Sequence, residues 1–332
     1  MKIITEAQVE QYLTLPECIT AMREAMIAVS SGETVLPIRQ FMPIPDTQGK
    51  MAIMPGAIES PACFGIKLVC KYVREPDSPL GTHVGMVLIF DSEKGMPLAM
   101  IEGASLTAIR TSAASAMATD ILANDAVDTL LVMGGGEQAK RHIRSMLAVR
   151  NPNSILVWGR TMDRIEPFAR EMSEETGRTV TAVTDAETAA RASDLICTTT
   201  ASKTPILLGA WVQPGAHVNL VGAAIPTSAE IDSDLVAKSR YVVDYRPAAM
   251  AAAGELLNAI KETRIEASHI AGEIGEIAAG NVPGRTRPDD ITVYKSLGVS
   301  AQDMSAGYTL YSKAVEVGFG LDIELLDHPT TS

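Results

Sequence analysis

Residues 129–139 read Thr-Leu-Leu-Val-Met-Gly-Gly-Gly-Glu-Gln-Ala and carry the clearest fold signal in the chain. A short apolar run precedes the pattern GxGxxA, in which Gly134, Gly136 and Ala139 hold the three fixed positions. In this pattern the first glycine makes a tight turn, the second lets the backbone approach a pyrophosphate, and the small third residue lets the helix pack on the strand. The free N–H groups at the helix start favour an anion. We therefore predict a strand, a loop and a helix that bind a dinucleotide.

Predicted strands and helices continue to alternate downstream of this loop. Apolar runs at 154–158, 179–183, 194–199, 217–221, 241–244 and 291–295 predict strands, and the segments 137–150, 164–176 and 247–260 predict helices. Strands that alternate with helices at this spacing are typical of a doubly wound parallel sheet. The fold class predicted is α/β, with a Rossmann-type dinucleotide-binding domain over residues 119–299.

The residues on either side of that domain have a different pattern. Apolar runs at 50–54, 65–72, 86–90 and 97–101, with a hairpin turn at 91–95, predict an antiparallel sheet. Helices are predicted at 17–29, 105–123 and 301–317. Because the sheet precedes the dinucleotide domain and a helix follows it, we predict a discontinuous α+β domain made of residues 1–118 and 300–332.

The end of the second strand bears on the choice of nucleotide. Gly159, Arg160 and Thr161 follow it directly. An acidic residue here would hold the ribose 2′-hydroxyl of NAD, whereas an arginine can pair with the 2′-phosphate of NADP. Arg160 favours NADPH; in the alternative interpretation it is a solvated residue that stacks on adenine. The cofactor predicted is therefore NAD(P)H, with the choice between the two left open.

A group of cations in the first domain has two interpretations: Arg39, Lys67, Lys71, Arg74 and Arg110. A cation inside an apolar run is rarely buried without a partner. The cations could form a pocket for a carboxylate, since arginine offers a planar fork and lysine a point charge. They could also form salt bridges within the chain or extend to water. Spacing alone slightly favours the second interpretation.

Composition excludes several classes of protein. The chain has 332 residues, 46% of them apolar, and a formal net charge of −12 with no basic block, which argues against nucleic acid as a partner. No stretch reaches the ~20 apolar residues that span a bilayer, so no membrane partner is expected. Glu6 and Glu10 interrupt any signal peptide, and four scattered cysteines predict neither disulfides nor a metal site. We expect a cytoplasmic protein that acts on a small molecule.

Taken together, the motifs resemble the ornithine cyclodeaminase/mu-crystallin family over nearly the whole chain. The segments that carry the resemblance are 37–39, 54–56, Lys67, 82–85, 106–111, the glycine loop, 221–223, 295–298 and Asp303. The most specific is Thr-Ala-Ile-Arg-Thr, residues 107–111, because ordinary Rossmann dehydrogenases lack it. The resemblance implies a homodimer whose discontinuous first domain binds substrate and builds the subunit interface.

The resemblance also implies roles for individual residues. Arg39, Lys67 and Arg110 would hold a substrate carboxylate, with His83 as a further substrate contact. In the reduction of an imine, the catalytic proton would come from Lys67 or from a bound water. The residues that the resemblance and the loop motif assign to the cofactor are Arg110, Thr111, Gly134, Gly136, Glu137, Gln138, Gly159, Arg160, Thr161, Thr199, Ala201, Val221, Gly222 and Ser296.

One position departs from the family pattern. Cyclodeaminases and archaeal alanine dehydrogenases of this family carry Gly-Ala-Asp-x-Pro, with the Asp as acid/base group, whereas this chain has Ala224 there. A methyl group cannot move a proton. The leading hypothesis is therefore an NAD(P)H-dependent imine reductase that converts a 2-imino acid to the amino acid. An ornithine cyclodeaminase-type lyase with recycled NAD, and a non-catalytic crystallin-like protein that binds NADPH and a small ligand, stay as alternatives.

Three substrate types fit this hypothesis: iminosuccinate, a cyclic ketimine and pyrroline-2-carboxylate. Lys71, Arg74 and His83 could meet a second carboxylate, which would favour a dicarboxylic substrate. In the alternative interpretation, which is the stronger one for Lys71 and Arg74, these two residues lie on a solvated strand edge, and His83 is a hydrogen-bonded structural residue.

Overall fold

The computed structural model describes residues 1–73 and 83–325. The chain divides into two compact units, Met1–Arg110 with Val299–Ser332 (unit 1) and Thr111–Gly298 (unit 2). The first boundary lies eight residues before the one predicted at 118/119. It falls inside the continuous helix α3 (Gly103–Leu122), so the sequence pattern has no break there. None of the helices in the described part of the chain is long and apolar enough to cross a bilayer.

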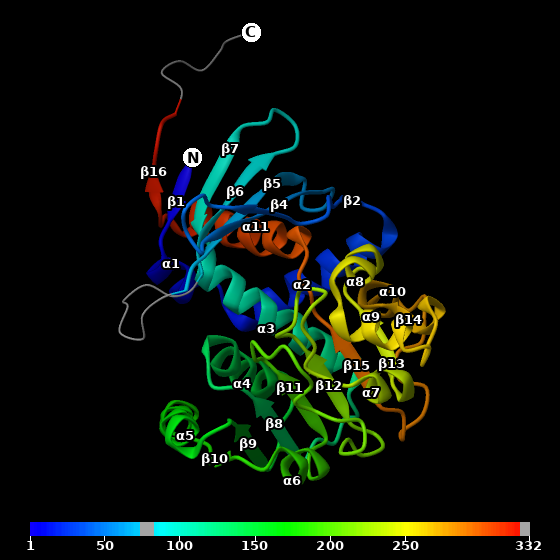
Figure 1. Cartoon of the computed structure of the whole chain (residues 1–332). Helices are drawn as coiled ribbons and strands as arrows, with labels where there is room; N and C mark the ends of the chain where they lie inside the picture. Colours follow the sequence, from blue (N-terminus) through cyan, green and yellow to red (C-terminus); the bar gives the residue numbers. More distant parts are fainter. Residues whose placement is uncertain (74–82, 326–332) are drawn as a thin grey trace. The chain divides into compact units, whose positions relative to one another are not determined.

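Unit 2 is built on a parallel sheet, whose strands are coloured from green through yellow to orange in Figure 1. Its described strands lie in the order β10-β9-β8-β11-β12-β15-β13-β14. Their bounds are β8 Thr129–Met133, β9 Ser154–Trp158, β10 Val180–Val183, β11 Leu195–Thr198, β12 His217–Leu220, β13 Arg240–Val243, β14 Ile270–Glu273 and β15 Thr292–Lys295. The Rossmann-type doubly wound sheet predicted from the sequence is confirmed.

The burial of its central strands explains why this sheet forms. Every residue of β8, β11, β12 and β15 is buried. Strands covered on both faces need near-continuous apolar runs, which is the pattern seen before and after the glycine loop. The helices of unit 2 are α4 Glu137–Val149, α5 Met162–Thr176, α6 Ala186–Arg191, α7 Ser233–Lys238, α8 Arg246–Ala252, α9 Gly254–Lys261 and α10 Ile274–Ala278, with a 3-10 turn at Ala267–His269.

One prediction in this unit was wrong, and one strand was not predicted. The helix predicted over 247–260 is two helices, α8 and α9, which meet at Ala253 in extended backbone. A Cβ on Gly254 would lie 2.1 Å from the carbonyl oxygen of Ser228, so this glycine permits a close backbone approach at the break. Strand β14 was missed because it has only four residues and two of them are Gly272 and Glu273.

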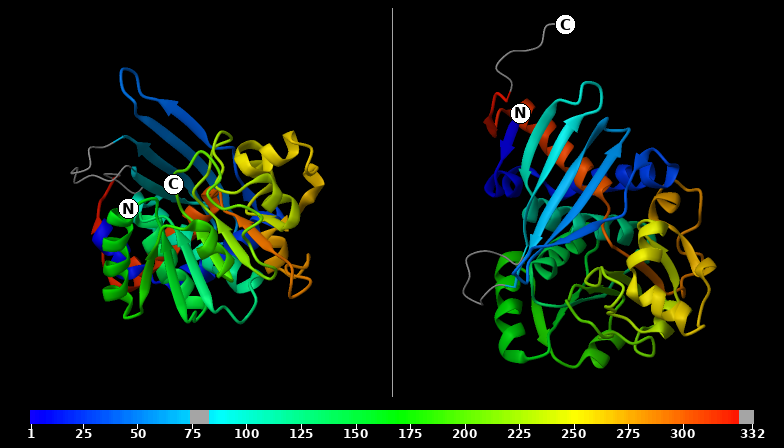
Figure 2. Two further views of the ribbon diagram at one scale, coloured as in Figure 1. Left: turned by 60° about the horizontal axis from the view of Figure 1, so that its bottom comes forward. Right: turned by 45° about the horizontal axis from the view of Figure 1, so that its top comes forward.

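Unit 1 is a mostly antiparallel sheet (Figure 2, right) that packs against the long helix α11 (Ser300–Val317), which in turn packs against α2 (Leu15–Ser31). The sheet order is β16-β1-β7-β6-β5-β4-β2, with β3 also paired to β4. The strands are β1 Lys2–Ile4, β2 Thr34–Val35, β3 Gln40–Pro43, β4 Lys50–Ile58, β5 Cys63–Lys71, β6 His83–Asp91, β7 Pro97–Glu102 and β16 Leu321–Asp322. The helices are α1 Glu6–Tyr12, α2 Leu15–Ser31 and α11 Ser300–Val317, with the first part of α3.

Strand β4 continues past the predicted end at Met54 because Pro55 falls in a gap between neighbouring strands. On one side of β4, β3 pairs with Lys50–Ile53 and β2 pairs with Ala57 and Ile58. The missing N–H of Pro55 therefore costs no ladder bond there. The hydroxyl of Ser300, the first residue of α11, donates to the Pro55 carbonyl at 2.7 Å.

The sheet of unit 1 is apolar on both faces. Alternate residues of β5, including Lys67 and Val69, are buried on the face that meets α11. The residues between them, together with their neighbours on β4, β6 and β7, form the opposite face, which we call the outer face: Met51, Ile53, Phe64, Ile66, Leu68, Val84, Met86, Leu88, Phe90, Leu98 and Met100. Antiparallel sheets usually turn a polar face to water, so the outer face is unusual for a surface.

Candidate functional site

A buried ionic cluster lies in unit 1 where β5, α3 and α11 meet. The Lys67 ammonium lies 2.9 Å from Oδ1 and 2.7 Å from Oδ2 of Asp303. The Arg110 Nε donates to Oδ1 of Asp303 at 2.8 Å, and its Nη1 donates to Gln302 Oε1 at 2.7 Å. Lys67 is 2% exposed, Arg110 3% and Asp303 not at all. The one carboxylate balances at most one of the two buried cations, which leaves positive charge for an anionic ligand.

Burial and neighbouring charges shift the titration of this cluster. Burial, followed by the charge of Arg110, lowers the pKa of Lys67 from 10.5 to about 7, although Asp303 opposes the change. Burial alone would raise the pKa of Asp303, but Arg110 and Lys67 outweigh it and hold that pKa below its usual value. A lysine with a pKa near neutrality can exchange a proton at physiological pH.

The other cations predicted in unit 1 lie near this cluster to different degrees. Arg39 lies close enough for its charge to contribute to lowering the pKa of both Lys67 and Lys71. Lys71 is partly buried, and burial is the main reason its pKa is lowered. His83 opens β6 opposite Lys71, but its side chain lies outside the described residues. Arg74 also lies outside them, so the idea of a second carboxylate site stays a prediction.

In unit 2 the glycine loop has the geometry that its pattern requires. Gly134 has φ +128°, and a Cβ there would lie 2.7 Å from Thr199 Oγ1. Gly136 precedes α4 as its N-cap, and a Cβ there would meet nothing within 4 Å. The loop therefore leaves open space beside the start of α4. Glu137 opens that helix and pairs with Arg141 at 2.6 Å, while the side-chain oxygen of Gln138 is buried without a hydrogen-bond partner among the described residues.

A cavity of about 580 Å³ opens beside this loop. Its described lining brings together two groups of predicted cofactor residues, Gly134 of the loop and Gly159, Arg160 and Thr161 after β9. The remaining lining residues are Gly135, Trp158, Arg164, Ile165 and Thr200. This lining includes two arginines and no carboxylate. Arg164, in the first turn of α5, was not among the predicted cofactor residues, and no helical spacing links it to Arg160, which precedes the helix.

A buried glutamate ties two further predicted segments together. The Glu230 carboxylate is fully buried and accepts from the Gly222 N–H, the Thr200 N–H and the Thr200 hydroxyl, each at 2.7 Å. It also accepts from the Thr198 hydroxyl at 2.8 Å. The loops after β11 and β12, which contain Thr199, Ala201, Val221 and Gly222, are therefore held at one edge of the sheet. Burial raises the pKa of Glu230, against these hydrogen bonds.

The position of the missing family carboxylate lies two residues beyond Gly222. Ala224 is partly buried and packs against the apolar core of unit 2. Its neighbour Ala223 accepts from the buried Lys295 ammonium, which is paired with Glu255 at 3.2 Å. Ser296 follows Lys295, and its hydroxyl is buried without a hydrogen-bond partner among the described residues. The unpartnered polar atoms of Ser296 and Gln138, with the open space at Gly136, fit the predicted nucleotide.

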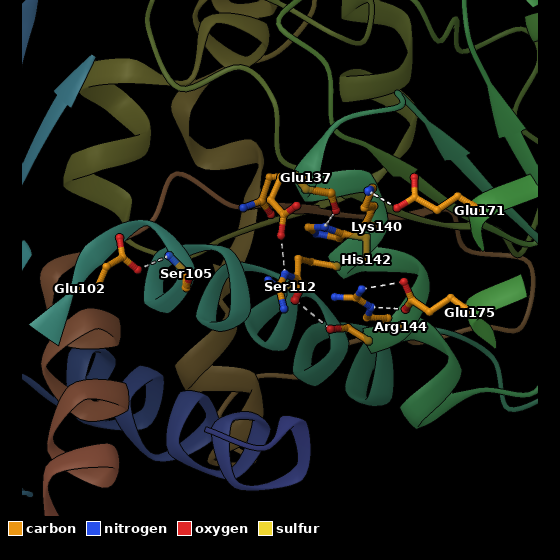
Figure 3. A network of polar contacts seen from close by, with 12 residues as sticks. Glu102, Ser105, Ser112, Glu137, Lys140, His142, Arg144, Glu171 and Glu175 are labelled. Carbon is orange, nitrogen blue, oxygen red and sulfur yellow. Dashed lines mark hydrogen bonds and ion pairs between the residues drawn. The ribbon is translucent and has the colours of Figure 1, made fainter. Parts of the chain in front are cut away.

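Buried serine and histidine side chains join α3 to α4. Figure 3 labels one of them on each helix, Ser112 on α3 and His142 on α4. The Nε2 of His142 lies 2.9 Å from Ser115 Oγ and its Nδ1 lies 2.7 Å from the Gln138 carbonyl, while Ser145 donates to Ser112 at 2.8 Å. Burial lowers the pKa of His142 to about 4. The imidazole is therefore neutral and serves packing. These contacts fix the helix that carries Gln138.

Figure 3 also shows how the outer side of α4 is held. Lys140 and Arg144 pair with Glu171 and Glu175 of α5. At the start of α3, Glu102 accepts from the N–H groups of Ala104 and Ser105 at 2.6 and 2.9 Å. A carboxylate in this position satisfies the free N–H groups of a helix start.

Comparisons with known proteins agree with the fold and the motifs. The model of the ornithine cyclodeaminase/mu-crystallin family matches residues 1–318. A Delta(1)-pyrroline-2-carboxylate reductase of Bacillus cereus is 34% identical over 98% of this chain and all of its own length. The solved Delta(1)-pyrroline-2-carboxylate reductase of Thermococcus litoralis, in complex with NADH and L-proline, has a TM-score of 0.92 and 30% identity, and covers 97% of this chain and 100% of that one.

A third similar protein is an archaeal alanine dehydrogenase dimer with bound NAD. It has a TM-score of 0.91 and 27% identity, and the match covers 98% of this chain and 99% of that one. On the family match and on the full-length relative, this chain belongs to the ornithine cyclodeaminase/mu-crystallin family.

Proposed function

We propose that this protein is an NAD(P)H-dependent imine reductase that converts a cyclic 2-imino acid of the pyrroline-2-carboxylate type to the amino acid. In this reaction C2 of the C=N bond gains a hydride and the nitrogen gains a proton, so that one reduced cofactor and one proton are consumed for each amino acid formed. The observation that carries the proposal is the buried cluster of Lys67, Asp303 and Arg110, because it combines excess positive charge with a lysine that titrates near pH 7.

In the proposal each residue of this cluster has a separate role. Asp303 and Gln302 engage Nε and Nη1 of Arg110, and its Nη2 binds one oxygen of the substrate carboxylate. Arg39 binds the other oxygen. Asp303 holds the Lys67 ammonium by both oxygens, and Lys67 donates the proton that the imine nitrogen takes up. Ala224 supplies no acid, and reduction of a preformed imine does not require one there.

The cofactor side of the proposal lies in unit 2. When bound, a reduced nicotinamide supplies the hydride. The loop at Gly134 and Gly136 and the start of α4 would hold the pyrophosphate. Arg160 and Arg164 would hold a 2′-phosphate, so we expect the chain to bind NADPH more tightly than NADH. Arg160→Asp should reverse that order in a fluorescence titration, and an unchanged ratio of the two Kd values would contradict the assignment.

The proposal includes a homodimer formed through the outer face of unit 1. Phe64, Val84 and Met86 on this face are 38%, 42% and 40% exposed, and Phe64 stacks on Phe90 with ring centroids 5.3 Å apart. Exposed apolar surface of this kind is typical of a protein interface.

The proposal also places the protein in the cytoplasm. The four free cysteines support this compartment, because cytoplasmic thiols stay reduced.

The proposal is tested by following NADH and NADPH consumption in separate reactions. The substrates are pyrroline-2-carboxylate, its six-membered homologue, and pyruvate or oxaloacetate mixed with ammonia. The proposal predicts cofactor oxidation with the cyclic imines and none with the 2-oxo acids alone. Oxidation without an amine would indicate a ketone reductase. Ammonia release from ornithine with no net change in NADH would indicate the lyase, and tight nucleotide binding with no turnover would indicate a binding protein.

A further inference from the structure

We propose that Thr107 is a further substrate-binding residue, whose hydroxyl donates a hydrogen bond to the carboxylate of the 2-imino acid beside Arg110. The inference rests on the proposed function, since it concerns the same ligand. Thr107 lies in the most family-specific segment of the sequence, 107–111, yet the roles described so far leave it without a function.

Within the described part of the chain, the hydroxyl of Thr107 lacks the partner that a buried hydroxyl needs. Thr107 Oγ1 is buried and has no hydrogen-bond partner among the described residues. A buried hydroxyl without a partner destabilises a protein, so such groups are rare unless a ligand satisfies them.

Other threonines in helices of this chain bond their hydroxyls to the backbone, whereas Thr107 makes no such bond to the residues that the structure describes. A serine or threonine inside a helix commonly donates its hydroxyl to the carbonyl four residues earlier. Thr20 donates to the Pro16 carbonyl at 3.1 Å, and Thr309 to the Ser305 carbonyl at 3.0 Å. Thr107 has the same backbone opportunity on α3, with Gly103 four residues before it, and does not use it. Its hydroxyl is therefore available to another acceptor.

Thr107 lies beside Arg110 on α3. Thr107 precedes Arg110 by three residues, so both side chains lie on the same face of α3. That face carries the guanidinium held by Asp303 and Gln302. Glu102 fixes the start of the helix one turn earlier. An anion bound by Arg110 therefore lies beside a rigid, unpartnered donor, and a hydroxyl that donates to a carboxylate forms a charge-assisted bond.

The test compares two threonine-to-valine variants, which keep the shape of the side chain and remove the hydroxyl. Thr107→Val is measured against Thr309→Val, whose hydroxyl is bonded within its own helix. For each we measure KM and kcat with pyrroline-2-carboxylate, Kd for pyrrole-2-carboxylate as a planar analogue, Kd for NADPH, and Tm without ligand.

Thr107→Val should raise KM and the Kd for pyrrole-2-carboxylate about 10- to 100-fold, the loss expected for a hydrogen bond to a charged group. Its kcat and its Kd for NADPH should stay the same. Its Tm should stay the same or rise, because the change removes an unpartnered buried hydroxyl. Thr309→Val should lower Tm and leave KM unchanged, and Thr107→Ser should restore KM.

Two results with Thr107→Val would overturn the inference. A lower Tm with unchanged KM and analogue affinity would make Thr107 a structural residue. A lower kcat with unchanged KM would make its hydroxyl part of proton transfer instead of carboxylate binding. If the wild-type protein binds pyrrole-2-carboxylate through Thr107 but reduces no imine, the proposed function fails and this inference stands. If the wild type neither binds the analogue nor turns over any imine, both are overturned.

Discussion

Replacing Asp303 by asparagine tests the buried cluster most severely, because it removes the only carboxylate among its described side chains and nearly preserves the shape. Asp303 is fully buried and lies 2.7–2.9 Å from the Lys67 ammonium and 2.8 Å from the Arg110 Nε. Each contact is worth about 6 kcal/mol of gross attraction at an effective dielectric constant of about 20. Desolvation offsets most of that attraction. Removing one partner of a buried pair nonetheless costs about 3–5 kcal/mol, because a buried charge loses its compensation.

The substitution should also change the titration of Lys67. Asp303 is the group that raises the pKa of this lysine toward its usual value, against burial and Arg110. Without it the pKa falls below about 7, and the ammonium is lost at a lower pH. If the ammonium donates the proton, kcat/KM for imine reduction decreases as pH rises through about 7 in the wild type, and through a lower pH in the variant. Because the wild type and the variant are compared with the same substrate, the titration of that substrate affects both pH profiles equally.

The assays are scanning calorimetry for stability and a pH series of kcat/KM for titration. The control is Asp322→Asn, which breaks the Lys2–Asp322 pair at 2.9 Å, where the Asp322 side chain is 75% exposed. An exposed pair contributes about 0–1 kcal/mol, so this variant should match the wild type in both assays. If Asp303→Asn is as stable as the control, or leaves the pH midpoint in place, the account of the cluster is wrong.

Three other predictions address unit 2 and the interface. His142 has a pKa of about 4 in the folded chain and about 6.5 in the unfolded chain, so the stability it contributes is complete above pH 6.5 and decreases as pH falls toward 4, by about 3 kcal/mol. Denaturant unfolding followed by the fluorescence of Trp158 and Trp211, both in unit 2, should show this dependence of the free energy of unfolding on pH. His142→Gln should reduce the dependence, and an equal dependence in the wild type and the variant would refute the prediction. Gly136→Ala should keep Tm and weaken nucleotide binding about tenfold or more, because its Cβ meets no protein atom but occupies the space for the pyrophosphate. Unchanged affinity would place the pyrophosphate elsewhere. Met86→Glu should convert a dimer to a monomer in light scattering, whereas Val315→Glu, at an exposed position of α11, should not; a wild-type monomer would exclude the interface.

The sequence predicted the Rossmann sheet well because its signals are local. The run 129–133 and the GxGxxA loop prescribe a buried strand, a turn with a positive φ at Gly134 and a helix start, and each of these is present. The break between α8 and α9 was not predictable in the same way. It depends on the approach of Gly254 to the Ser228 carbonyl, which is 26 residues away in the chain.

The candidate site was predicted in part for the same reason. A cation in an apolar run marked Lys67 and Arg110, but spacing could not show that both share Asp303, which is 236 residues from Lys67. The cluster thus satisfies both interpretations of these cations, because it contains salt bridges within the chain and still has an excess of positive charge. The hydroxyl of Thr107 is equally invisible in a sequence, since its role depends on a hydrogen bond that the fold leaves unmade.

We propose that this chain adds a hydride to the C=N carbon of a cyclic 2-imino acid. The most direct measurement uses NADPH or NADH deuterated at the transferable position, with pyrroline-2-carboxylate and mass spectrometry of the product. We predict proline that carries one deuterium at Cα, formed in equal amount to the cofactor consumed. Proline without deuterium, or no proline while the cofactor is bound, would contradict the account.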